Sequence, residues 1–152
     1  MNYFVAEEFE INVRYVDEAK GMNMIVDSGA PVSIATSKWM EKYLKTMGVK
    51  KEETTENECK RKFRMGENVY LSKREITLPV RMKTENDDYI RRMITVSIVD
   101  KEDELFLCGL KTLIEWKAAV FYEKSEMMFD ETKKRAYMSI SGVIYIFIFL
   151  SN

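Results

Sequence analysis

The acid whose surroundings best suit catalysis in this sequence is Asp27. It follows the apolar residues 24–26 and precedes Ser28, Gly29 and Ala30. Apolar, β-prone residues before it predict a strand that ends at the acid, so we expect the carboxyl group to be at least partly buried. A buried carboxylate is costly unless hydrogen bonds or a shifted pKa compensate for the lost water. Asp27 is therefore the first candidate for acid–base chemistry.

The Asp-Ser-Gly tripeptide alone does not decide between two interpretations. Asp, Ser and Gly are also typical of an ordinary turn that ends a strand, where each is favoured for its backbone geometry. The rest of the sequence must distinguish a catalytic turn from a structural one.

Composition excludes several classes of site. The 24 Lys and Arg residues nearly balance the 25 Asp and Glu residues, which argues against a nucleic-acid or anionic-membrane surface. The chain has no histidine, which excludes Ser-His-Asp and Cys-His nucleophilic sites, and with only two cysteines it lacks the usual structural zinc sites. No Gly-rich phosphate loop is present. We expect no metal and no cofactor.

The two cysteines, Cys59 and Cys108, lie far apart and suit reduced thiols. With no signal peptide opening the sequence, this predicts an intracellular, cytoplasmic location. The apolar run 143–150 is far shorter than the roughly 20 residues of a membrane-crossing helix, so no stable membrane span is expected. It suits a buried strand, and a second reading makes it a membrane-surface or assembly strand.

The periodicity predicts a mainly β domain. Residues 10–15 and 22–26 are expected to pair as a hairpin that delivers Asp27 at its end, and the highly charged residues 50–60 are expected to form a solvated loop. Pro79 argues for an edge position or a bulge. Further strands are predicted at residues 75–82, 89–99, 105–109, 120–122, 127–129, 137–140 and 143–150.

Two short helices are expected. Thr36 and Ser37 are N-cap candidates, Gly48 stands at the C-cap position, and an apolar stripe at helical spacing lies between them. Residues 110–118 also suit a helix. The stripe is formed by Trp39, Met40, Tyr43, Leu44 and Met47, and is interpreted as a core face.

Residues 62–71 predict a second hairpin, with Gly66 at its tip. Two readings are open for it. It is either an ordinary surface hairpin or a mobile flap whose glycine lets backbone groups approach a ligand.

Three segments together resemble the retropepsin-type aspartic proteases of retroviruses and retrotransposons. Residues 25–30 resemble the family's active-site turn, in which a hydrophobic residue precedes Asp-Thr/Ser-Gly-Ala. Residues 63–68 with the strand 76–80 resemble its flap, and residues 105–113 resemble the segment and helix behind the turn. The likeness is greatest to proteases encoded in invertebrate retroelement polyproteins.

The resemblance implies a small, closed, β-barrel-like retropepsin fold with one or two short helices. The resemblance covers residues 10–130 and implies a domain over residues 1–130, and it leaves 131–152 as a C-terminal extension that is a candidate terminal or dimer-interface strand. The implied function is a homodimeric aspartic endopeptidase that cleaves extended polypeptide in retroelement polyprotein processing. The alternative is a catalytically inactive dimerisation or peptide-binding module with the same fold.

The resemblance also implies a role for each matching residue. Asp27 is the catalytic acid, Ser28 bonds across the dimer axis, and Gly29 and Ala30 line the floor of the site. Pro31 departs from the family, because retroviral members often carry there an acid that contacts substrate. The flap residues are Met65, Gly66 and Glu67, and the support behind the turn is Leu107, Cys108 and Gly109.

The chemistry of peptide hydrolysis then requires a second copy of the chain. An aspartic protease activates water with two carboxylates that share one proton. This sequence has one Asp-Ser-Gly and is too short for two lobes, so the second carboxylate must come from another copy across a two-fold axis.

Overall fold

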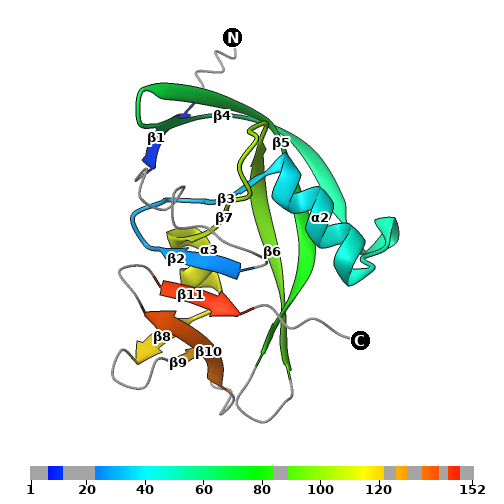
Figure 1. The fold of residues 1–152 in the computed structure, drawn as a ribbon, viewed down its shortest axis with the longest axis vertical. Coiled ribbons are helices and arrows are strands. Elements are labelled where there is room, and N and C mark those ends of the chain that lie inside the picture. Colours follow the sequence, from blue (N-terminus) through cyan, green and yellow to red (C-terminus); the bar gives the residue numbers. More distant parts are fainter. Residues whose placement is uncertain are drawn as a thin grey trace.

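The computed structural model describes residues 7–11, 23–83, 89–121, 126–129, 135–140 and 144–147. These residues are mainly β with two short α-helices, which confirms the predicted fold class (Figure 1). In chain order the elements are β1 (Glu7–Ile11), β2 (Asn23–Asp27), β3 (Ser33–Thr36), α2 (Ser37–Met47), the 3-10 turn η1 (Lys51–Glu53), β4 (Thr55–Met65), β5 (Asn68–Lys83), β6 (Tyr89–Val99), β7 (Phe106–Gly109), α3 (Leu110–Glu115), β8 (Ala118–Phe121), β9 (Glu126–Phe129), β10 (Arg135–Ile140) and β11 (Ile144–Phe147).

The described strands form one sheet in the order β1-β4-β5-β6-β3-β7-β2-β11-β10-β9-β8. Strand β2 lies between β7, to which it is parallel, and β11, to which it is antiparallel. The register places Asp27 beside Gly109. The strand that carries the candidate acid is thus held on both sides by strands distant in sequence (Figure 1).

The expected N-terminal hairpin is wrong in its pairing. Residues 12–22, which include most of its first strand and its turn, lie outside the described residues. The part of that strand that is described belongs to β1, which pairs in parallel with β4. Both neighbours of β2 are strands distant in sequence, β7 and β11, so neither edge of β2 is left for the segment that precedes it.

The predicted loop at residues 50–60 is also wrong. Only its start is irregular, since η1 ends at Glu53 and β4 begins at Thr55. The charged side chains lie mostly in solvent, and the strand is stabilised by its antiparallel register with β5 from Thr55 to Met65. Backbone pairing overrides the low β-propensity of these residues.

Both predicted helices are present, and the second is shorter than expected. In α2 the Thr36 side chain accepts a hydrogen bond from the Trp39 N–H, and Gly48 ends the helix in the left-handed conformation, with φ 61°. Helix α3 ends at Glu115, and residue 118 already belongs to β8. Two caps recognisable in the sequence fix α2, whereas α3 has no side-chain cap.

The apolar stripe of α2 packs into the larger of two buried clusters, as predicted. Trp39 stacks on Tyr43 with ring centroids 5.0 Å apart. The Tyr43 hydroxyl donates a hydrogen bond to the Pro79 carbonyl at 2.9 Å, and burial raises the pKa of Tyr43 to about 12. Pro79 pairs only with β6, because the register of β4 with β5 stops at Thr77. It therefore occupies the local edge position that the sequence predicts.

The smaller cluster lies between the candidate turn and the β4–β5 hairpin. Its buried members are Ile25, Ala30, Ile34, Phe63, Met65, Val99, Leu105 and Leu107. Among the described residues, no helix is both long and apolar enough to cross a bilayer.

Candidate active site

Asp27 is the last residue of β2, and only 5% of its surface is exposed. The strand before it is buried at residues 24–26. The two residues after it, Ser28 and Gly29, are exposed, and Ala30 is buried again. The acid therefore stands where a buried strand reaches the surface of the molecule.

Two backbone amides hold the Asp27 turn. The Gly29 N–H donates a hydrogen bond to Asp27 Oδ1 at 2.9 Å, and the Ala30 N–H donates to the Asp27 carbonyl at 3.1 Å. Burial raises the pKa of the Asp27 carboxyl above its usual 3.8, and the hydrogen bonds from Gly29 and Ala30 act in the opposite direction. Loss of solvation outweighs the amide bonds, so protonation is easier here than on an exposed carboxyl.

Helix α3 fixes the far side of this turn. The Leu110 N–H donates to the Ala30 carbonyl at 2.7 Å, and the Lys111 N–H donates to the Pro31 carbonyl at 3.0 Å. A Cβ atom added to Gly109 would lie 2.4 Å from backbone atoms of Val32, which is closer than real Cβ atoms approach. Glycine is therefore the one residue type that fits at position 109 while the helix and the turn are this close.

A buried pair of hydroxyl groups completes the contact. Ser33 Oγ lies 2.6 Å from Thr112 Oγ1 and accepts a hydrogen bond from the Gly109 N–H at 2.9 Å. Both side chains are almost fully buried. Together with the backbone amide contacts of Gly109, Leu110 and Lys111, this pair forms what we call the turn–helix clamp, made by residues 30–33 and 109–112. It ties the loop after Asp27 to the helix.

Sequence reasoning missed Ser33 and Thr112. They are 79 positions apart, and neither belongs to a local motif. The available signal was weak: Ser33 lies between the apolar residues Val32 and Ile34, where a buried hydroxyl needs a partner, but Thr112 follows Lys111 and has no such signal.

The three residues expected behind the turn lie in β7, next to β2. Leu107 and Cys108 are fully buried and pair with Ile25 and Val26. Burial raises the pKa of the Cys108 thiol strongly, which keeps it protonated. The thiol therefore fills space beside the acid's strand and is not poised as a nucleophile.

The three expected flap residues lie at the end of the β4–β5 hairpin. Met65 pairs with Asn68 across a two-residue turn, and Gly66 has φ 65°. Met65 is buried in the same cluster as Ala30, which brings the base of the hairpin tip to the turn. Glu67 is exposed and makes no hydrogen bond or ion pair with the described residues. The structure thus joins Met65 to the Asp27 turn through apolar packing and leaves Glu67 at the surface.

Within the part of the chain that the structure describes, no group of three His, Cys, Asp or Glu side chains is placed to hold a metal ion. The chemistry available at the turn is that of one carboxyl group with a raised pKa and the exposed hydroxyl of Ser28 beside it.

Comparison with known proteins gives one kind of match. No protein-family model matches the sequence, and no curated protein matches it. Among solved structures, the crystal structure of the retroviral protease-like domain of Ddi1 from Leishmania major is similar to this chain, with 16% sequence identity and a TM-score of 0.37. The alignment covers 77% of this chain and 87% of that chain.

Proposed function

We propose that this chain is one subunit of a homodimeric aspartic endopeptidase that cleaves extended polypeptide. The observation that carries the proposal is Asp27 itself. It is a nearly buried carboxyl with a raised pKa, at the point where β2 reaches an exposed Ser-Gly turn. An aspartate that only shapes a surface turn would keep its carboxyl group in water, and its pKa would not be raised by burial.

In the proposed dimer, two copies of Asp27 face each other across the two-fold axis. Two carboxylates a few ångströms apart cannot both ionise, so the pair holds one proton. The ionised carboxylate takes a proton from a water molecule, which attacks the scissile carbonyl carbon. The protonated carboxyl polarises the carbonyl oxygen, and the proton is later returned to the leaving amine.

The neighbouring residues would position this pair. Exposed Ser28 would bond across the axis and hold the two turns in register. Gly29 and Ala30 would form the floor under the substrate backbone. The turn–helix clamp supports this arrangement in one chain, because it fixes the loop that follows the acid to α3.

The β4–β5 hairpin would cover the bound peptide. Its residues Met65, Gly66 and Glu67 lie at the end of two long paired strands, and Met65 already reaches the cluster that contains Ala30. Closing over the peptide would exclude bulk water from the two carboxyl groups. We further propose that the biological substrate is a retroelement polyprotein, on the resemblance of residues 25–30, 63–68 and 105–113 to that family.

Cleavage of an unstructured peptide pool tests the activity. The pool is incubated at about pH 5, where a shared-proton pair can be half-ionised, and the products are read by mass spectrometry. We expect the protein to cleave and Asp27→Asn to abolish cleavage. Asp100→Asn is the matched control, because it makes the same chemical change at an exposed loop residue and should leave cleavage unchanged.

Mixing experiments test the shared site. If each site needs an Asp27 from both chains, equal amounts of wild type and Asp27→Asn should leave about one quarter of the dimers active after exchange. Independent one-chain sites would leave half of the activity. Cleavage by a strictly monomeric protein in sedimentation, or equal cleavage by wild type and Asp27→Asn, would contradict the proposal.

A further inference from the structure

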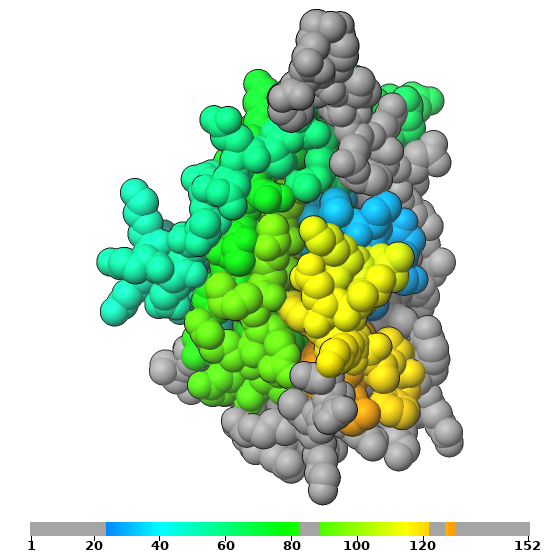
Figure 2. Space-filling model, turned by 180° about the vertical axis from the view of Figure 1, so that it is seen from behind, coloured from blue at the N-terminus to red at the C-terminus, as the bar shows by residue number. Residues whose placement is uncertain are grey.

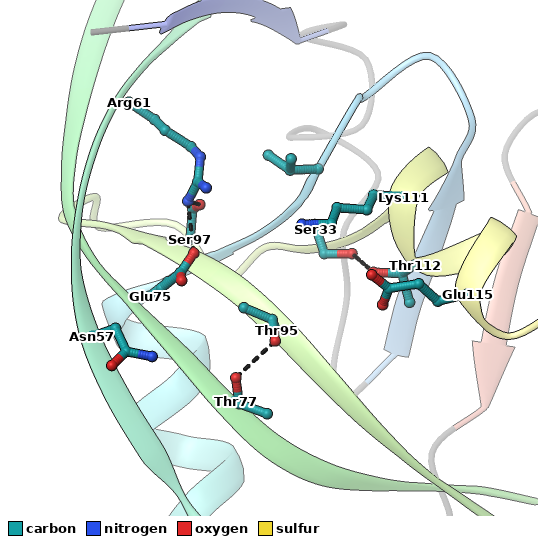
Figure 3. A pocket seen from close by; sticks show the side chains of 11 residues that line it. Ser33, Asn57, Arg61, Glu75, Thr77, Thr95, Ser97, Lys111, Thr112 and Glu115 are labelled. Carbon is teal, nitrogen blue, oxygen red and sulfur yellow. Dashed lines mark hydrogen bonds and ion pairs between the residues drawn. The ribbon is translucent and has the colours of Figure 1, made fainter. Parts of the chain in front are cut away.

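A polar cavity lies on the far side of the turn–helix clamp, between α3 and the face formed by β4, β5 and β6. From behind, α3 and the strands of that sheet lie next to each other (Figure 2). The cavity has a volume of about 270 Å³. Its lining is polar except for Val32, and comprises Ser33, Asn57, Arg61, Glu75, Thr77, Thr95, Ser97, Lys111, Thr112 and Glu115 (Figure 3).

The charged groups on the sheet side are already paired with each other. Arg61 donates to Glu75 Oε2 at 2.8 Å and to Ser97 Oγ at 2.9 Å. These two charges compensate each other, so this wall offers a ligand mainly hydrogen-bonding groups. The Thr77 and Thr95 hydroxyls, 2.7 Å apart, add to them.

The helix side of the cavity carries two further charged groups. Lys111 and Glu115 are four residues apart on α3, opposite Arg61 and Glu75 across the cavity (Figure 3). Neither side chain has a hydrogen-bond or ion-pair partner within the described residues. A lysine that precedes a glutamate by four positions is the weaker orientation for a helical ion pair. Both charges therefore remain available to a ligand.

We propose that this cavity binds a small zwitterion, a free amino acid with a polar side chain. Its carboxylate would pair with Lys111 and its ammonium group with Glu115. The four charged side chains of the lining sum to zero, so a ligand with a single charge would leave one of the two helix charges without a partner. A volume of about 270 Å³ accommodates roughly ten non-hydrogen atoms, judged by the share of volume that one water takes in the liquid.

The cavity also adjoins the candidate active site. Ser33 and Thr112, the buried hydroxyl pair of the clamp, form part of its lining. An occupant would therefore pack against the contact that ties the Asp27 loop to α3, and should stabilise that contact. The binding itself does not depend on the proteolytic function.

Ligand chemistry provides the first test. L-serine and L-glutamine are compared with their N-acetyl derivatives, which keep only the carboxylate, and with their amides, which keep only the ammonium group. Binding to the full chain is measured by ligand-observed NMR and by the shift in the thermal unfolding midpoint. We expect at least one free amino acid to bind and to raise the midpoint, with affinity about tenfold or more above that of either derivative. Equal binding of the derivatives, or no binding of either free amino acid, would overturn the proposal.

Paired substitutions provide the second test. Lys111→Met and Glu115→Gln should each weaken binding of the free amino acid by about tenfold. Lys45→Met and Glu41→Gln are matched controls, because they make the same changes at exposed positions four residues apart on α2. Circular dichroism checks that every variant is folded. Unchanged binding in both α3 variants, or an equal loss in the α2 variants, would place any bound amino acid elsewhere and reject the site.

Discussion

The Asp27 turn packs against Gly109 of β7, and the β4–β5 turn contains Gly66, and these two glycines are required for different physical reasons. Around Asp27 the chain is crowded: α3 donates two backbone hydrogen bonds to the loop, and Gly109 has no room for a Cβ. Around Gly66 the chain is open, and the glycine is required by a positive φ of 65° in a two-residue hairpin turn. Gly109 is required because a side chain would clash with the neighbouring backbone, and Gly66 is required because its φ is positive.

This difference distinguishes the turn that positions Asp27 from the β4–β5 hairpin that is proposed to close over the substrate. The Asp27 loop is held by contacts to a helix more than 75 positions away in sequence. The end of the β4–β5 hairpin is held by its own register, by the pairing of β1 with residues 61–65 of β4, and by the burial of Met65, while Val69 and Leu71 on β5 are 44% and 41% exposed. The molecule thus fixes the loop after the carboxyl with side-chain and backbone contacts to α3, whereas at the hairpin end the contacts lie on β4 and the β5 side is more exposed.

Gly109→Ala should have the largest effect on this comparison. Its Cβ would clash with the Val32 backbone, which cannot move without breaking the clamp. We expect the free energy of unfolding to fall by about 3 kcal/mol, measured by urea denaturation. Gly48→Ala separates crowding from strain, because Gly48 has a φ of 61° and no atom within 4 Å of an added Cβ. It should cost only about 1 kcal/mol, and an equal cost at both positions would show that crowding is not the cause.

Thr112→Val should come next. It keeps the shape of the side chain but removes the hydroxyl that pairs with Ser33 in a buried site. A loss of about 2 kcal/mol in the free energy of unfolding is expected. Thr112→Ser should restore most of it. At the exposed pair, Thr95→Val should change stability little, because water replaces the lost partner of Thr77. A large effect at Thr95 with none at Thr112 would contradict the buried clamp.

Gly66→Ala should have a smaller effect, confined to the hairpin. A side chain at φ 65° costs about 1.5 kcal/mol, and no contact with the turn–helix clamp is lost. Hydrogen exchange should show faster exchange in the backbone amides of residues 62–71 and unchanged exchange at residues 27–33. Faster exchange around Asp27 would show that the two turns are coupled more tightly than their contacts suggest.

The smallest expected effect is the pH dependence that Asp27 contributes to stability. Because its pKa is raised above 3.8 in the folded chain, the folded state holds its proton more tightly than the unfolded state. The free energy of unfolding should therefore fall as the pH rises from about 3.8 through the raised pKa. Asp27→Asn keeps an acceptor for the Gly29 N–H and removes this dependence. We expect the stability of the variant to rise relative to that of the wild type as the pH increases from about 3 to 7, measured by thermal unfolding. A constant difference across this range would contradict the raised pKa.

The sequence predicted best those features that local residues determine. The caps Thr36 and Gly48 mark the ends of α2, and the strand predicted at residues 89–99, with Ile94, Val96 and Ile98 on one face, has the bounds of β6. The hairpin at Gly66 follows from a glycine between two β-capable segments. Each of these signals lies within a few positions of the structure that it specifies.

What the sequence did not reveal depends on distant partners. The many charged residues at positions 50–60 led to the prediction of a loop where β4 lies. A strand whose side chains are exposed needs only a backbone partner, and β5 supplies it. The neighbours of β2 could not be read locally, since β7 lies about 80 positions later and β11 about 120. The Asp27 turn was recognisable from its residues, but the hydroxyl pair that secures it is visible only once β3 and α3 meet.

The place of β11 beside β2 has a consequence for biosynthesis. Residues 144–147 supply the backbone partners of Asn23–Val26, so a nascent chain still on the ribosome carries the strand before Asp27 with one edge open until these late residues emerge. Until then the sheet around the acid is incomplete. If the proposed protease forms, its pairing with a second copy would follow translation of this late segment, which would delay any cleavage until the whole domain has been made.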